Sequence, residues 1–270
     1  MSTWHYGLVA RWWAEFAEPG PEIEYFRRFV EAGQPALDLA CGTGRLLLPY
    51  LRAGLDVDGC DISPDMVAAC LAAAEGAGFT PNLYIQPMHE LDLPRRYRTI
   101  FVCGGFGLGS DRDQDGEALR RILAHLEPGG LLLLDRELPY ANPRLWRYWT
   151  NDGRRELPRP WPEPGDRRLA GDGAEYALQT RLVDFDPLAQ RAVRQIRATM
   201  WRNGELLTEE EHELTENFYF AHELVLMLER AGFVAVDVRG QYDDRPPTAD
   251  DETLVFLGRR PRRACRLPAS

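Results

Sequence analysis

The residues that could do chemistry begin with the loop DLACGTG, where Asp38, Gly42 and Gly44 stand between an apolar segment and a helix start. Glycines at such a junction let the backbone approach a ligand closely. A second acid, Asp61, ends the next apolar segment. In a doubly wound sheet, a carboxylate at that position accepts hydrogen bonds from the two hydroxyls of a ribose. The spacing therefore predicts a nucleotide-like ligand.

The same loop argues against the common phosphate-containing ligands. Leu47 stands where the dinucleotide pattern GxGxxG has its third glycine, which argues against a nicotinamide-dependent oxidoreductase. The chain contains no lysine, so a P-loop and Schiff-base chemistry are excluded. Asp38, directly before the loop, disfavours phosphate and favours a cation. We therefore expect a ligand that combines a ribose with positive charge.

The runs DLACGTG and DISPDM (Asp61 to Met66) together resemble the first two motifs of the class I S-adenosylmethionine (SAM)-dependent methyltransferases. The resemblance covers about residues 35–138 and the C-terminal helix and hairpin. It implies SAM as the cofactor, with Asp61 on the ribose and Ile62 and Met66 beside the base. The residues that it places at the methionine end are Asp38, Ala40, Gly42 and Gly44.

Two further positions follow from this resemblance. Family members often carry Asp-Met after the third strand, whereas this chain has Pro87-Met88, so we expect the adenine to rely on the Met88 backbone or on His89. Cys103 ends the fourth strand, where the methyl donor points at the substrate.

The N-terminal run YGLVARWW resembles a lid motif of small-molecule methyltransferases, with Tyr6, Ala10 and Trp13 in matching places. In that interpretation Tyr6 and Trp13 exclude water and face the sulfonium by cation–π attraction. The alternative is an amphipathic helix whose aromatic residues simply face the core.

Candidates for acceptor binding and catalysis lie further along the chain. We expect Glu137, Tyr140 and Glu216 to contact the substrate, and His212 or Tyr219 to act as a general base. The alternatives are that His212 is a surface residue and that Tyr219 belongs to the core. The arginines of the strand around residue 194 could bind an acidic substrate or could form a solvated face; they are Arg191, Arg194 and Arg197.

The substrate class is narrowed mainly by what is missing. The fourth-strand run VCGGFGLG lacks the Asn/Asp-Pro-Pro-Tyr motif of adenine and glutamine methyltransferases, and the net charge of −10 disfavours nucleic acid. No ligand triad indicates a metal site. We expect methyl transfer to N or O of a small metabolite, the resemblance being to bacterial enzymes that decorate amino sugars or other secondary metabolites. The alternative is a non-catalytic SAM-binding regulator or partner protein.

The whole chain of 270 residues, 44% of them hydrophobic, suits a globular protein. It has no apolar stretch that could span a bilayer and no secretion signal, and its five cysteines lack CxxC spacing. We therefore expect a cytoplasmic protein with reduced thiols and no membrane partner. We expect it to be a monomer or a homodimer.

The predicted elements give an α/β fold, doubly wound, because apolar strands alternate with helices up to Asp135. Residues 139–173 are expected as loop with little helix, and three extended runs follow: Tyr176–Phe185, Arg191–Arg202 and Glu210–Phe220. The other bounds that we predict are a helix over Gly44–Ala53, a helix over Ala221–Ala231 that Gly232 ends, and strands over Val234–Gly240 and Thr253–Arg259. With the resemblance, we expect a mostly parallel seven-stranded sheet with an antiparallel last strand, plus a small inserted antiparallel β cap. The expected division is an N-terminal helical lid (1–34), a Rossmann-like SAM-binding core (35–138 and 221–260), a substrate cap (139–220) and a disordered tail (261–270).

Overall fold

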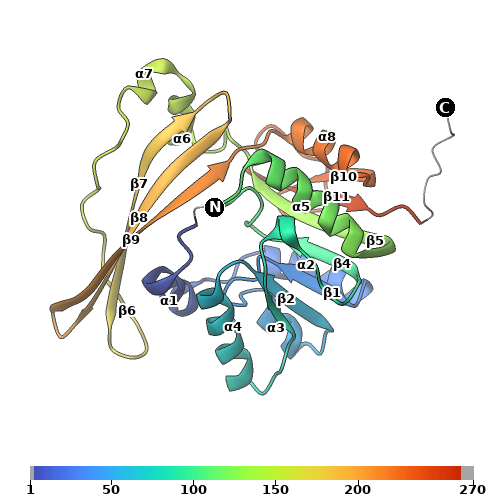
Figure 1. The fold of residues 1–270 in the computed structure, drawn as a ribbon, viewed down its shortest axis with the longest axis horizontal. Helices are drawn as coiled ribbons and strands as arrows, with labels where there is room; N and C mark the ends of the chain where they lie inside the picture. The colour runs from blue at the N-terminus through green and yellow to red at the C-terminus, as the bar shows by residue number, and fades with distance from the viewer. Residues whose placement is uncertain (1–2, 263–270) are drawn as a thin grey trace.

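The centre of the fold is a seven-stranded sheet with the order β10-β11-β5-β4-β1-β2-β3, seen in Figure 1. The computed structural model describes residues 3–262. The pairs from β5 to β3 are parallel, and β11 runs antiparallel to both of its neighbours. The strands are β1 (Ala36–Leu39), β2 (Val57–Asp61), β3 (Leu83–Ile85), β4 (Tyr97–Val102), β5 (Leu126–Glu137), β10 (Val234–Gly240) and β11 (Thr253–Arg259). This confirms the predicted fold class.

Both faces of this sheet are covered because successive side chains of a strand point to opposite sides. Leu37 and Ile100 enter one hydrophobic cluster, and their neighbours Ala36 and Phe101 enter the other. The first face is covered by α5 (Arg112–His125) and α8 (Ala221–Ala231), and the second by α2 (Glu22–Ala32), α3 (Leu47–Arg52) and α4 (Pro64–Gly76). The helices on both faces therefore hold the carboxyl ends of the parallel strands in fixed positions.

A second sheet, in the order β6-β7-β8-β9, forms the cap and stands beside the core in Figure 1. Its strands are β6 (Arg168–Leu169), β7 (Glu175–Asp186), β8 (Arg191–Arg202) and β9 (Glu205–Asn217). Its inner face packs against α1 (Gly7–Phe16), where Leu8 and Val9 meet Tyr176 and Ile196. The N-terminal helix is thus enclosed between the cap and the core.

Several boundaries differ from the sequence prediction. The helix expected from Gly44 begins only at Leu47, because Gly42 and Gly44 have φ of +53° and +88°, which helices do not contain. The last cap strand begins at Glu205 and not at residue 210, since it follows the Asn203-Gly204 turn directly. Residues 139–173, expected as loop with little helix, contain α6 (Pro143–Trp146), η2 (Arg147–Trp149), α7 (Asn151–Arg154) and β6.

Two other expectations meet the structure only in part. No helix within residues 3–262 is long and apolar enough to cross a membrane. Most of the tail expected to be disordered, residues 263–270, lies outside the described residues. The division of the chain into lid, core and cap stays a prediction.

Candidate functional site

A cavity of about 560 Å³ lies where the parallel strands of the core end. Its walls come from the segments that follow β1, β2, β3 and β4, from the end of β5, from the N-terminal segment and from the inner face of the cap. Ligands of open α/β sheets bind at this edge. The cavity is therefore the candidate site.

The loop after β1 brings its backbone close to this cavity. Ala40, Gly42 and Gly44 all have positive φ, at +70°, +53° and +88°. A Cβ on Gly44 would lie 2.7 Å from the Sγ of Cys70, so only glycine fits there. Ala40 and Gly42 line the cavity, whereas Gly44 is not among the lining residues and serves to shape the turn.

Asp61, at the end of β2, holds this loop in place. One carboxylate oxygen accepts the Gly42 N–H at 2.9 Å and the other accepts the Ser63 N–H at 2.8 Å. The side chain is buried, and this burial raises its pKa. Each carboxylate oxygen has two lone pairs, so Asp61 can still accept bonds from ligand hydroxyls in the cavity that it lines.

Asp38 is a buried carboxylate with one oxygen that lacks a partner. It is 2% exposed, it lines the cavity, and its Oδ2 has no hydrogen-bond partner. Burial, with the nearby charge of Asp61 as a smaller cause, raises its pKa well above the ordinary value. An unpaired buried carboxylate is costly, and a cationic ligand group would remove that cost. This atom is the strongest sign that the cavity accepts a positively charged ligand.

Another part of the cavity wall is apolar. Ile62 and Met66 line it from the start of α4, and Met88 and His89 line it from η1 (Met88–Glu90). The Nε2 atom of His89 lies 3.3 Å from Nε2 of Gln114 on α5. A flat heterocycle fits between two methionine side chains and an isoleucine.

A further part of the cavity wall is lined by charged residues from β5 and the cap. Glu137 and Glu216 line it, as do Asp135, Arg136 and Arg194, while Tyr140 is not among the lining residues. Asp135 accepts the Gly104 N–H at 2.5 Å and the Tyr242 hydroxyl at 2.6 Å. The Sγ of Cys103, which also lines the cavity, lies 3.2 Å from the same carboxylate. The end of β4 is therefore fixed by β5.

A family model described as a methyltransferase domain matches residues 36–130, the segment that carries this loop and both buried acids. Residues 36–130 are therefore a methyltransferase domain. A putative methyltransferase from Geobacillus sp. is 23% identical over 83% of each chain, and the ubiquinone biosynthesis O-methyltransferase of Nitrobacter winogradskyi is 32% identical over 37% of this chain and 38% of that one.

Solved structures show the same fold. The CcbJ methyltransferase from Streptomyces caelestis matches with a TM-score of 0.67 at 21% identity, over 95% of this chain and 100% of that one. The sugar N-methyltransferase KedS8 from Streptoalloteichus sp. matches with a TM-score of 0.65 at 20% identity, over 97% and 98%. The family model and the Geobacillus relative make the protein an enzyme, while these two structures show its fold.

The N-terminal segment of the methyltransferase closes over the cavity differently from the expectation. Trp13 lines it, but Tyr6 does not; the Tyr6 ring lies 6.5 Å from the His212 ring. Three lining residues that the sequence analysis missed precede Tyr6: Thr3, Trp4 and His5. The segment is tied down by Ser63 Oγ, which donates to the His5 carbonyl, and by Asp65 and Glu210, which accept the first N–H groups of α1.

The two expected general bases of the methyltransferase are not among the lining residues. His212 comes earlier on β9 than Leu214 and Glu216, which do line the cavity. Its Nε2 lies 3.1 Å from Glu210. Tyr219 is 1% exposed, and its hydroxyl donates to Asp115. Burial, together with the Asp115 charge, raises the Tyr219 pKa far above its ordinary value. These placements do not support a role as base.

Proposed function

We propose that this methyltransferase transfers the methyl group of SAM to a nitrogen or oxygen atom of a small molecule, with Glu137 as the carboxylate that takes the acceptor proton. The observation that carries the proposal is that Glu137 lines a cavity of about 560 Å³, a size typical of small-ligand sites. Two similar proteins are described as a sugar N-methyltransferase and a ubiquinone biosynthesis O-methyltransferase, which supports the same substrate class.

The methyl donor would bind along the residues of β1, β2 and η1, and we call this part of the cavity the donor half. The part that β5 and the cap line is the acceptor half. Asp38 offers its unpartnered oxygen to the ammonium of the methionine end, and Asp61 offers lone pairs to the ribose hydroxyls. The adenine lies among four side chains, Ile62, Met66, Met88 and His89. Ala40, Gly42 and Cys103 complete this wall, and Trp13 covers it. The bound cofactor supplies an electrophilic methyl group.

The chain's own contribution to the reaction is alignment and proton removal. Asp135 fixes Cys103 and Gly104 at the point where the donor and acceptor halves of the cavity meet. Glu137, the next residue but one on β5, lines the acceptor side. Partial burial, followed by the charge of Glu216, raises the pKa of Glu137 and so makes it a better base. Glu216 contacts the acceptor less directly because both of its oxygens are bound to arginines.

The test is Glu137→Gln, with Glu252→Gln as the matched control. Glu252 is an exposed carboxylate near Glu137 that is not among the cavity-lining residues. Panels of small amines and small alcohols or phenols are incubated with SAM labelled in its methyl group, and the accepted panel separates N- from O-methylation. We expect kcat to fall about 100-fold in Glu137→Gln, while SAM affinity and the Glu252→Gln variant stay unchanged. Turnover of Glu137→Gln within about threefold of wild type contradicts the role of Glu137.

A further inference from the structure

Arg194 is the one arginine of β8 that lines the cavity among the described residues. On this strand, Arg194 pairs with Leu214 of β9, and both side chains are on the inner face of the cap with Glu216. Arg197 is on the outer face instead, where it forms ion pairs with Glu209 and Glu211. The inner position gives Arg194 access to the acceptor.

The guanidinium of Arg194 is only partly used by the protein. Its Nε donates to Oε2 of Glu216 at 3.0 Å. Within residues 3–262, no hydrogen bond or ion pair is made by its two terminal nitrogens. The side chain is 27% exposed, and the cavity is the space that it lines. A guanidinium with its terminal nitrogens open in a cavity can bind a carboxylate or a phosphate through two parallel hydrogen bonds.

The carboxylate that binds Arg194 is shared with a second arginine. Glu216 serves two guanidiniums, because its Oε1 lies 3.2 Å from Nη2 of Arg136. Arg136 is 6% exposed, its Nη2 also donates to the Asn217 carbonyl, and its Nε is buried without a partner. The carboxylate of Glu216 is therefore divided between two guanidiniums, and the terminal nitrogens of Arg194 are left for a ligand in the cavity.

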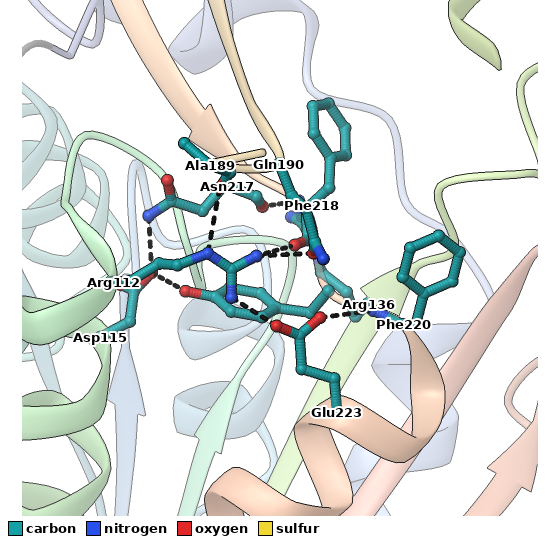
Figure 2. A network of polar contacts seen from close by, with 10 residues as sticks. Arg112, Asp115, Arg136, Ala189, Gln190, Asn217, Phe218, Phe220 and Glu223 are labelled. Atoms are coloured by element: carbon teal, nitrogen blue, oxygen red, sulfur yellow. Dashed lines mark hydrogen bonds and ion pairs between the residues drawn. The ribbon is translucent and has the colours of Figure 1, made fainter. Parts of the chain in front are cut away.

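Two further carboxylates of the cavity wall, Asp115 and Asp135, make their hydrogen bonds with neutral donors and not with Arg194. Asp115 is bound to Ser110, Asn217 and Tyr219, as Figure 2 shows in part. Asp135 is bound to Cys103, Gly104 and Tyr242. Glu137 feels the charge of Arg194 but makes no ion pair with it. Glu137 and Arg194 thus lie within electrostatic range of each other on the walls of one cavity, and both can contact one small molecule.

We infer that the methyl acceptor carries an anionic group, a carboxylate or a phosphate, which Arg194 binds while the accepting atom lies at Glu137. This inference rests on the proposed function, because it assumes that the acceptor occupies this part of the cavity. It makes Arg194 a specificity residue contributed by the cap. Arg136 is a positioning residue, since it acts by holding Glu216, which in turn holds Arg194.

The experiment measures anion binding to the full chain saturated with S-adenosylhomocysteine, at constant ionic strength, so that no turnover is needed. Inorganic phosphate and acetate are titrated separately, and the stronger of the two identifies a phosphate or a carboxylate site. Wild type is compared with Arg194→Met and with the matched control Arg197→Met on the opposite face of the same strand. Arg194→Lys keeps the positive charge but cannot form two parallel hydrogen bonds to one anion.

We expect saturable binding of one anion to wild type, at least about tenfold weaker in Arg194→Met, intermediate in Arg194→Lys and unchanged in Arg197→Met. Unchanged S-adenosylhomocysteine affinity shows that the Arg194→Met variant is folded. If this variant does not fold, the anion affinity of Arg194→Lys decides whether Arg194 binds the anion. No saturable binding, or equal binding in the Arg194 and Arg197 variants, overturns the inference. Because Glu137→Gln is scored by turnover and this site by binding, either proposal can fail without the other.

Discussion

The donor half and the acceptor half of the cavity are built in different ways. The donor half comes mainly from residues 38–44 and 61–66, the loops that follow two adjacent parallel strands. The acceptor half combines β5 with Arg194 and Glu216 from the cap, more than fifty residues further along the chain. One half is a product of local backbone geometry, and the other exists only when the cap is held against the core.

The two halves also treat their charges differently. In the donor half, Asp38 is buried without a partner for Oδ2, so the protein carries a cost that a cationic ligand can remove. In the acceptor half, hydrogen bonds and ion pairs hold Asp115, Asp135 and Glu216. The donor half thus leaves a carboxylate oxygen open to a cation, whereas the acceptor half holds its carboxylates in place and leaves the terminal nitrogens of Arg194 open.

A single arginine shows how the acceptor half is held. Arg112, the first residue of α5, donates to the carbonyls of Ala189 and Phe218 and reaches Gln190 and Glu223 (Figure 2). It thereby joins the core helix to the β7–β8 turn, to the exit from the cap and to α8. The cap is fixed at the end where it meets the cavity.

The largest expected effect lies in the donor half, at Asp61. Asp61→Ala removes the acceptor for the ribose hydroxyls and releases the N–H groups of Gly42 and Ser63. We expect SAM affinity, measured by calorimetry, to fall more than about 100-fold, because hydrogen bonds to a charged group contribute about 1.5 to 3 kcal/mol each. Asp92→Ala, at an exposed aspartate that is not among the cavity-lining residues, serves as the control. Wild-type affinity in Asp61→Ala would remove the basis for the donor half.

The next effect is a trade between stability and binding at Asp38. Because the folded protein raises the Asp38 pKa, the folded state binds this proton more tightly than the unfolded chain does. Its contribution to stability is therefore present at low pH and is lost as pH rises above about 4, the ordinary aspartate value. We expect Asp38→Asn, without cofactor at neutral pH, to be about 1 to 3 kcal/mol more stable by urea unfolding.

The same variant should bind SAM about 10- to 100-fold more weakly, since a neutral amide cannot pair with an ammonium group. Wild-type affinity should rise with pH as Asp38 ionises, and Asp38→Asn should lack that rise. A variant that is less stable than wild type at neutral pH, or that keeps the pH dependence, speaks against an unpaired Asp38 as the cation site.

The smallest effects are expected at the two former candidates for the general base. Tyr219→Phe loses one buried hydrogen bond to Asp115, so we expect about 1 to 2 kcal/mol less stability and kcat within about twofold of wild type. His212→Gln removes only a partly exposed pair with Glu210 and should change stability by less than about 0.5 kcal/mol. A large loss of kcat with unchanged folding in either variant would show that the residue takes part in catalysis.

The sequence by itself determined the donor half and the order of the core elements. Helix α8 and strands β10 and β11 have the predicted bounds, because their hydrophobic pattern and the Gly232 stop act locally. Glycines at 42 and 44 and acids at 38 and 61 were readable for the same reason: the carboxyl ends of neighbouring parallel strands must meet at one edge.

The tertiary structure alone decided the acceptor half. Side-chain alternation puts Glu216 and His212 on the same face of β9, yet only Glu216 lines the cavity, because α1 packs beside the part of that face that carries His212. Tyr219 follows the same strand but turns into the core toward Asp115. Asp135 and Arg136 gave no local signal, and the sequence did not separate Arg194 from the other candidate arginines of its strand, Arg191 and Arg197. Their roles depend on how two sheets pack, and sheet packing is set by long-range contacts that no local pattern records.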